Sequence, residues 1–117
     1  MRLREIVEIL DADVLVESDG LEREITAACA ADLMSDVMAY VKDNVLLLTG
    51  LLNVQVIRTA EMMDIKAVLF VRGKKPGEDI LQMAEKKNIV VLRTTEPMFI
   101  ASGKLYSAGI IGKGVWE

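Results

Sequence analysis

Three apolar runs in the second half of the chain share one layout, and this layout constrains the fold more than any other feature. Each run ends in a polar or glycine turn and leads into a segment whose apolar residues recur at helical spacing. Val45, Val68 and Val90 occupy equivalent places in the three runs and stand 23 and 22 residues apart. Continuous apolar strands that alternate with helices predict an α/β fold with a parallel sheet covered on both faces.

The other elements are predicted from the same patterns. The three runs are expected to form strands at 45–48, 67–71 and 89–92, followed by helices at 54–63, 78–87 and 98–108. In the first half, short strands are expected at 14–16 and 25–31, with a turn at 18–20. One face of an N-terminal helix is marked by Leu3, Ile6, Val7 and Leu10. Asp32 is predicted to cap the N-terminus of a further helix.

Composition narrows the class of protein. The chain has 117 residues and 52% of them are hydrophobic, which excludes intrinsic disorder and fits a single domain over residues 1–117. Residues 109–117 are predicted to be a loose or partner-packed tail. No apolar run approaches the roughly 20 residues that a membrane span needs, and Glu5 and Glu8 interrupt the segment where a signal peptide would lie. The single cysteine, Cys29, agrees with a reducing compartment, and we expect a cytoplasmic protein.

The charge is unevenly distributed along the chain. The formal net charge is -4, with a balance of -7 over residues 1–48 and +3 over residues 49–117. An acidic protein of this kind is a poor non-specific nucleic-acid binder, because such binding depends on a basic surface that neutralises phosphates. The basic second half is compatible with a local anion site, and the asymmetry is compatible with two subunits that meet acidic to basic.

The sequence offers little for catalysis. It contains no histidine and no G-x-x-x-x-G-K-[ST] motif, so it lacks the usual base near neutral pH and the phosphate cradle of P-loop kinases. Asp32, Ser35 and Asp36 are too few ligands for a dedicated magnesium site, and helix capping explains Asp32 and Ser35. Cys29 lies among alanines and is predicted to be a small buried hydrophobe. We therefore predict no catalytic residue, no metal site, no cofactor and no enzyme activity.

Several blocks of the chain resemble the DRTGG domain family. They are Ala30-Ala31-Asp32-Leu33-Met34-Ser35-Asp36-Val37, Leu47-Leu48-Thr49-Gly50, Phe70-Val71-Arg72-Gly73-Lys74-Lys75-Pro76 and Val90-Val91-Leu92. The family is similar to the N-terminal domain of the HPr kinase/phosphorylase, which implies a three-layer α/β/α unit with a small, mainly parallel sheet. It also implies a domain that occurs alone, beside CBS domains or attached to phosphotransacetylase, without assigned catalytic activity. The chain departs from the name-giving motif at Leu51-Leu52 and at Val71-Arg72-Gly73.

Polar residues and glycines follow each of the three strands, where parallel strands end at one edge of the sheet. Ligands of open α/β sheets bind at this carboxyl edge, because helix N-termini present free N–H groups there. The candidate ligand-binding residues are Thr49, Gly50, Asn53, Arg72, Gly73, Lys74, Thr94 and Thr95. A purely structural interpretation competes with this one. In it the glycines relieve backbone strain, Asn53 and Thr95 cap helices, and Lys74 and Lys75 are solvated.

Two functions of different classes follow. The first is a non-catalytic regulatory or interaction module that forms a homodimer or binds a protein partner, because the small apolar domain leaves surface for another subunit to cover. The alternative is a small-molecule sensor that binds an anion or a nucleotide at the carboxyl edge. Neither hypothesis involves a nucleic acid or a membrane.

Overall fold

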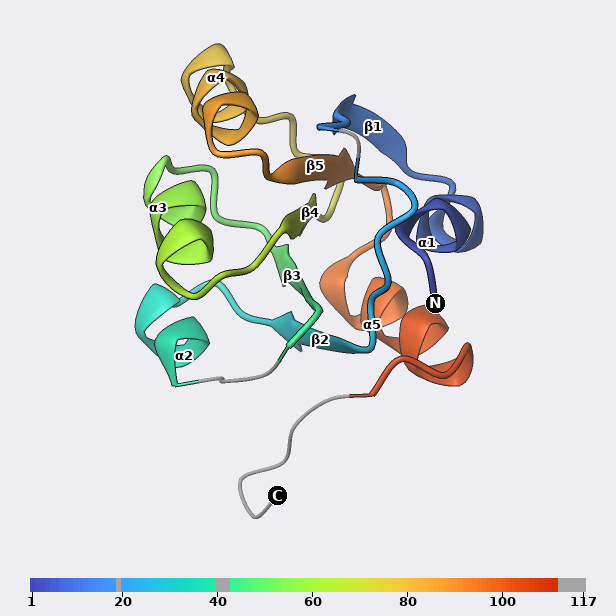
Figure 1. Ribbon diagram of the computed structural model, residues 1–117. Coiled ribbons are helices and arrows are strands. Elements are labelled where there is room, and N and C mark those ends of the chain that lie inside the picture. The colour runs from blue at the N-terminus through green and yellow to red at the C-terminus, as the bar shows by residue number, and fades with distance from the viewer. Residues whose placement is uncertain (19, 40–42, 112–117) are drawn as a thin grey trace.

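The protein is built around one five-stranded sheet with the strand order β1-β5-β4-β3-β2 (Figure 1). The structure is a computed structural model that describes residues 1–18, 20–39 and 43–111. Its strands are β1 (Asp13–Val16), β2 (Ala27–Ala30), β3 (Val45–Thr49), β4 (Ala67–Phe70) and β5 (Val90–Arg93). Strands β2 to β5 are parallel, and β1 pairs antiparallel with β5 at one edge. The predicted parallel sheet is confirmed.

Helices cover both faces of this sheet. They are α1 (Leu3–Leu10), α2 (Met34–Met38), α3 (Gln55–Met62), α4 (Glu78–Lys86) and α5 (Met98–Ser107). Figure 1 shows α2, α3 and α4 on one face and α1 with α5 on the other. The predicted limits of the last three helices differ from the observed ones by at most one residue at each end. The arrangement is the three-layer α/β/α fold expected from the sequence.

The core consists of two apolar layers, one on each face of the sheet. Alternate strand residues such as Leu47, Val68 and Phe70 pack towards α2, α3 and α4, whereas their neighbours Leu46 and Leu69 pack towards α1 and α5. Side chains of a strand point alternately to opposite faces, so both sets must be apolar when both faces are covered. This is why β3 and β4 appear in the sequence as continuous apolar runs.

The first residues of the predicted tail pack on the domain itself. Ile110 is buried, and Ile111 forms a parallel bridge with the edge strand β2, where the Ala28 N–H donates to the Ile111 carbonyl at 2.9 Å. The predicted looseness is therefore wrong for residues 109–111. Residues 112–117 of that tail, and Asp19 of the predicted turn at 18–20, lie outside the described residues. None of the described helices is long and apolar enough to cross a membrane.

Gly20 provides a test of how closely this sheet is packed. A Cβ at position 20 would lie 2.3 Å from Cγ2 of the buried Val90, a side chain at the start of β5 that cannot move aside. We expect Gly20→Ala to lower the free energy of unfolding by about 1–3 kcal/mol, the usual cost of overpacking. Gly50→Ala is the control, because its Cβ would meet only the flexible end of the Arg72 side chain. Urea unfolding of both variants measures the loss in the free energy of unfolding, and equal losses in the two variants would contradict the prediction.

Candidate site at the carboxyl edge

The turns after β3, β4 and β5 form one continuous hydrogen-bonded surface at the carboxyl edge of the sheet. The backbone N–H of Arg72 donates to the Glu96 carbonyl, and that of Gly73 donates to the Thr94 carbonyl, both at 2.8 Å. On the other side, Val71 N–H donates to the Thr49 carbonyl at 3.1 Å. The structure therefore brings together the three turns that the sequence placed at this edge.

Asp32, which follows β2, belongs to the same surface. Its Oδ1 accepts hydrogen bonds from the Gly50 N–H at 2.8 Å and from the Thr49 hydroxyl at 3.2 Å. The prediction that Asp32 caps α2 is wrong, because the N-cap is Leu33 and no side chain bonds to the helix start. The carboxylate instead accepts hydrogen bonds from two donors of the turn after β3. If it capped α2, these two donors would lose this partner.

Arg72 and Gly73 form a tight turn with unusual backbone angles. Their φ values are 63° and 67°, and the Lys74 N–H closes the turn on the Val71 carbonyl at 3.3 Å. Two successive positive φ angles define a type I′ turn, which glycine, asparagine and aspartate adopt most easily. An arginine in the left-handed region is strained by about 1–2 kcal/mol. The Arg72 side chain therefore occupies a position where other residues would be more stable.

The guanidinium of Arg72 lies against Gly50 and next to Asp32. A Cβ on Gly50 would come within 2.5 Å of Arg72 Nη2, so only glycine leaves room for the group in this position. Arg72 Nη2 is 3.9 Å from Asp32 Oδ2, which is an ion pair but not a hydrogen bond. The two side chains are 50% and 53% exposed, and the guanidinium donates no hydrogen bond to another described residue. The group is therefore half exposed and keeps donors that no described residue accepts.

Arg93, at the end of β5, supports the turn from the other side and is absent from the predicted site. Its Nε and Nη2 donate to the Gly73 carbonyl at 3.1 and 3.0 Å, and its Nη1 pairs with Asp13 Oδ2 at 2.8 Å. The register of the antiparallel pair places Asp13 opposite Arg93. This register has no signal in the sequence, and for that reason the sequence does not predict the pairing.

The hydroxyls of two predicted site residues are engaged within the protein. Thr49 and Thr94 are fully buried, and the Thr94 hydroxyl donates to the Leu10 carbonyl at 3.0 Å. The Asn53 side chain accepts from the Gln55 N–H at 2.8 Å at the start of α3, whose N-cap is Val54. The expectation that Thr95 caps α5 is wrong, because the N-cap of α5 is Pro97. Thr95 is exposed and Lys74 is half-buried. Arg72, Lys74, Thr95 and the exposed Asn53 are therefore the predicted site residues with side-chain groups left for a ligand.

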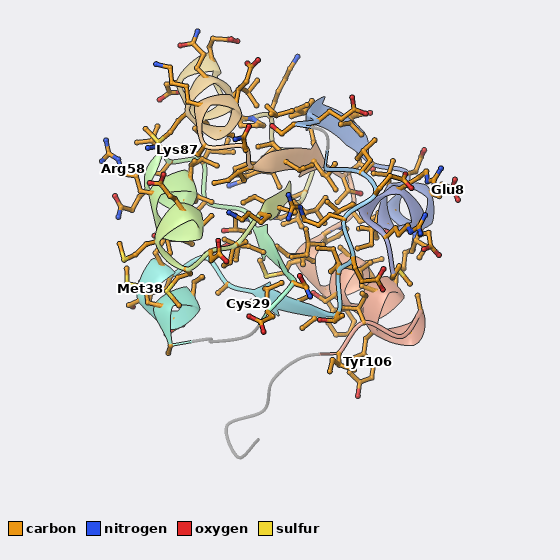
Figure 2. All side chains as sticks on the ribbon, viewed as in Figure 1. Glu8, Cys29, Met38, Arg58, Lys87 and Tyr106 are labelled. Carbon is orange, nitrogen blue, oxygen red and sulfur yellow. The ribbon has the colours of Figure 1, made fainter. Side chains whose placement is uncertain are left out.

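Cys29 lies on β2, on the opposite face from α5 (Figure 2). Burial raises the pKa of its thiol above the ordinary value of 9.0, and the negative charge of Asp36 raises the pKa further. The thiol therefore stays protonated at neutral pH, as expected for a small buried hydrophobe. Among residues 1–18, 20–39 and 43–111, no group of three or more Cys, Asp or Glu side chains is placed to hold a metal ion.

A second surface feature lies on α5, the helix that follows the turn after β5. One side of this helix packs on the sheet through Ala101 and Leu105. The opposite side carries Phe99, which is 85% exposed, and Tyr106, which is 74% exposed and points away from the body of the domain in Figure 2. Gly103 lies between them, and a Cβ there would meet nothing within 4 Å. Helix α5 thus presents apolar surface to the core and to solvent alike.

Comparisons with known proteins agree with this architecture. The family model described as "DRTGG domain" matches residues 5–107. A similar solved structure comprises the CBS and DRTGG domains of the regulatory region of Clostridium perfringens pyrophosphatase, complexed with its activator diadenosine tetraphosphate. The TM-score is 0.76 at 18% identity, and the likeness covers 94% of this chain but only 48% of that one. No curated protein sequence matches the chain. With the family model matching most of its length, this protein belongs to the DRTGG domain family.

Proposed function

We propose that the protein is a non-catalytic regulatory module that acts by association, and that it forms a homodimer through the exposed side of α5. The observation that carries the proposal is the apolar surface of Phe99, Ile100 and Tyr106 on a helix whose other side is already buried. Large apolar side chains that gather on the exposed side of a helix mark a surface that a partner covers. Exposed aromatic side chains of this kind are typical of protein interfaces.

The spacing of these residues favours a second copy of the chain as the partner. Phe99 precedes Gly103 by four residues and Tyr106 follows it by three, so the three lie on one side of the helix. Two α5 helices that cross antiparallel at Gly103 would bring the Phe99 ring of each copy close to the Tyr106 ring of the other. Such a contact is self-complementary, as a two-fold interface requires. The missing side chain of Gly103 allows the two helices to approach closely.

The first test is the mass of the protein in solution. We expect light scattering to report a dimer at micromolar concentration, twice the 12.9 kDa of the single chain. The mass should fall towards 12.9 kDa on dilution, because the proposed contact is a reversible surface contact and not part of the core. A constant 12.9 kDa across the micromolar range would contradict the proposal.

A second candidate function is the binding of an anion or a nucleotide at the carboxyl edge. The specific observation in its favour is Arg72, which lies in a strained turn and has a half-exposed guanidinium with unpaired donors. Strained residues of this kind cluster at functional sites. The pyrophosphatase region that resembles this chain was complexed with diadenosine tetraphosphate, although the likeness covers only about half of it. The resemblance to the HPr kinase/phosphorylase N-terminal domain remains a prediction, and we propose no kinase activity.

Arg72→Ala tests this second function. We expect the variant to bind ATP, AMP, acetyl phosphate or sulfate more weakly by about 1.5–3 kcal/mol, the range for a hydrogen bond to a charged group. Lys75→Ala is the matched control, because that exposed side chain is flexible and its charge is solvated. Calorimetry measures the affinities, and thermal unfolding adds a check, since a ligand at about 100 times its Kd stabilises the fold by about 2.7 kcal/mol. Equal binding by the wild type and Arg72→Ala would rule out this role of Arg72.

A further inference from the structure

The side chains of Asp32 and Arg72 form a carboxylate–guanidinium pair whose two members are held separately. Asp32 is fixed through Oδ1 by the Gly50 N–H and the Thr49 hydroxyl. This leaves Oδ2 turned towards Arg72 Nη2 at 3.9 Å. The backbone of Arg72 is set by its turn, and its guanidinium lies in the space that Gly50 leaves. The other ion pairs of the described residues are 2.6–3.1 Å long, so the Asp32–Arg72 pair is open by comparison.

This spacing suits a group that both donates and accepts a hydrogen bond. Charge-assisted hydrogen bonds are about 2.5–2.9 Å long, and twice this length exceeds the 3.9 Å between Oδ2 and Nη2. One oxygen atom beside the pair can therefore lie within bonding distance of both atoms. A hydroxyl group meets the requirement, because it donates to the carboxylate and accepts from the guanidinium. A phosphate oxygen does not, since it has no proton to give and is repelled by Asp32.

We propose that Asp32 and Arg72 together bind a sugar hydroxyl, so that the ligand class at this edge is a ribosyl phosphate rather than a simple anion. The proposal rests on the anion- or nucleotide-binding function proposed above. In this arrangement, Asp32 accepts a hydrogen bond from a ribose hydroxyl. The remaining donors of Arg72 face the phosphate, together with Lys74, which lies two residues along the turn. Carboxylates at the ends of parallel strands bind ribose hydroxyls in other α/β proteins, so the proposed contact has a precedent.

Asp32→Asn removes the acceptor atom that faces Arg72 and keeps the hydrogen bonds that support the turn after β3. The amide oxygen of the substituted side chain can still accept from the Gly50 N–H and the Thr49 hydroxyl, while its amide nitrogen replaces the acceptor that faces Arg72. Asp36→Asn is the control, because Asp36 is an exposed acid on α2 and loses the same charge. Gly50→Ala is the second variant, because it displaces the guanidinium without changing any charge.

The experiment is calorimetric titration of the wild type and these variants with AMP, its 2′,3′-dideoxy analogue, adenosine and inorganic phosphate. We expect the wild type to prefer AMP over the dideoxy analogue by about 10- to 100-fold, which corresponds to a hydrogen bond with a charged group. Asp32→Asn and Gly50→Ala should lose this preference and Asp36→Asn should keep it. Phosphate should bind to Asp32→Asn as well as or better than to the wild type, because a repelling charge is gone.

Each other outcome has a definite meaning. If the wild type binds AMP and the dideoxy analogue equally, the hydroxyl proposal fails while the anion site stands. If Asp32→Asn strengthens the binding of all ligands by the same factor, Asp32 only repels anions and the proposal also fails. If adenosine binds and phosphate groups add nothing, the anion function fails, and the ribosyl phosphate proposal fails with it even though a hydroxyl contact is present. If no titrant binds to the wild type, both are overturned.

Discussion

Truncation of Phe70 is expected to cost this protein most of its stability. Phe70 is fully buried on the central strand β4 and packs against the layer formed by α3 and α4. Replacing a buried phenylalanine by alanine removes its burial and leaves a cavity, and such changes cost about 3–5 kcal/mol. Domains of this size have a total stability of about 5–15 kcal/mol. Phe70→Ala should therefore unfold at a much lower urea concentration, or fail to fold.

The chain contains its own control for this experiment. Its other phenylalanine, Phe99, is 85% exposed, so Phe99→Ala makes the same chemical change without opening a cavity. At protein concentrations too low for association, we expect Phe99→Ala to change the free energy of unfolding by less than about 0.5 kcal/mol. Similar losses from both truncations would show that the core is not centred on β4. A loss from Phe99→Ala that appears only at high concentration would report association, because dimerisation stabilises the fold by mass action.

The layered fold could be predicted from the sequence because its main elements obey local rules. A strand covered on both faces needs an unbroken apolar run, and the β3, β4 and β5 runs, each followed by a helix, leave few alternatives. The antiparallel pairing of β1 with β5 could not be predicted in this way. It depends on contacts between residues far apart in the sequence, such as Asp13 and Arg93, for which no local pattern exists.

The candidate site was predictable in position but not in detail. Its location follows from the rule that turns after parallel strands share one edge, and this rule placed Arg72 and Gly50 correctly beside each other. The predicted role of Asp32 is wrong because an aspartate before a helix is usually its N-cap. Here its carboxylate bonds to the turn after β3. The choice between these partners depends on the distance between two loops, and composition and spacing do not contain that distance.

Arg72 links the stability of the turn to its proposed function. A type I′ turn prefers asparagine or glycine at this place, so the arginine is retained against a local cost. Natural proteins violate such local rules mainly at functional sites. The Arg93 side chain and the Glu96 carbonyl hold the backbone of the same turn without involving the Arg72 side chain. The scaffold of the turn therefore survives loss of this guanidinium, and a binding defect in Arg72→Ala can be attributed to the guanidinium itself.

The dimer proposed on α5 leads to the second large effect. Phe99→Ala and Tyr106→Ala should each raise the dimer Kd by about 30-fold or more, because central aromatic residues at interfaces contribute about 2 kcal/mol or more. Gly103→Ala should have opposite effects on the stability of the isolated chain and on the stability of the dimer. It should stabilise the isolated chain by about 0.5–1 kcal/mol, since alanine favours the helix and its Cβ meets open space, yet it should weaken the dimer by keeping the helices apart.

Met62→Ala tests whether the chain associates through α5 or through any exposed apolar residue. Met62 is a large, exposed apolar residue on α3, on the opposite face of the sheet, so its truncation should leave the dimer Kd unchanged. Sedimentation equilibrium over a dilution series measures the Kd of each variant, and unfolding at low concentration measures the stability of the single chain. If Met62→Ala weakens the dimer as much as Phe99→Ala does, association does not use α5. If Gly103→Ala stabilises the chain and tightens the dimer, the helices do not cross closely at Gly103. The combination of a more stable chain and a weaker dimer is the result that only a close crossing at this glycine predicts.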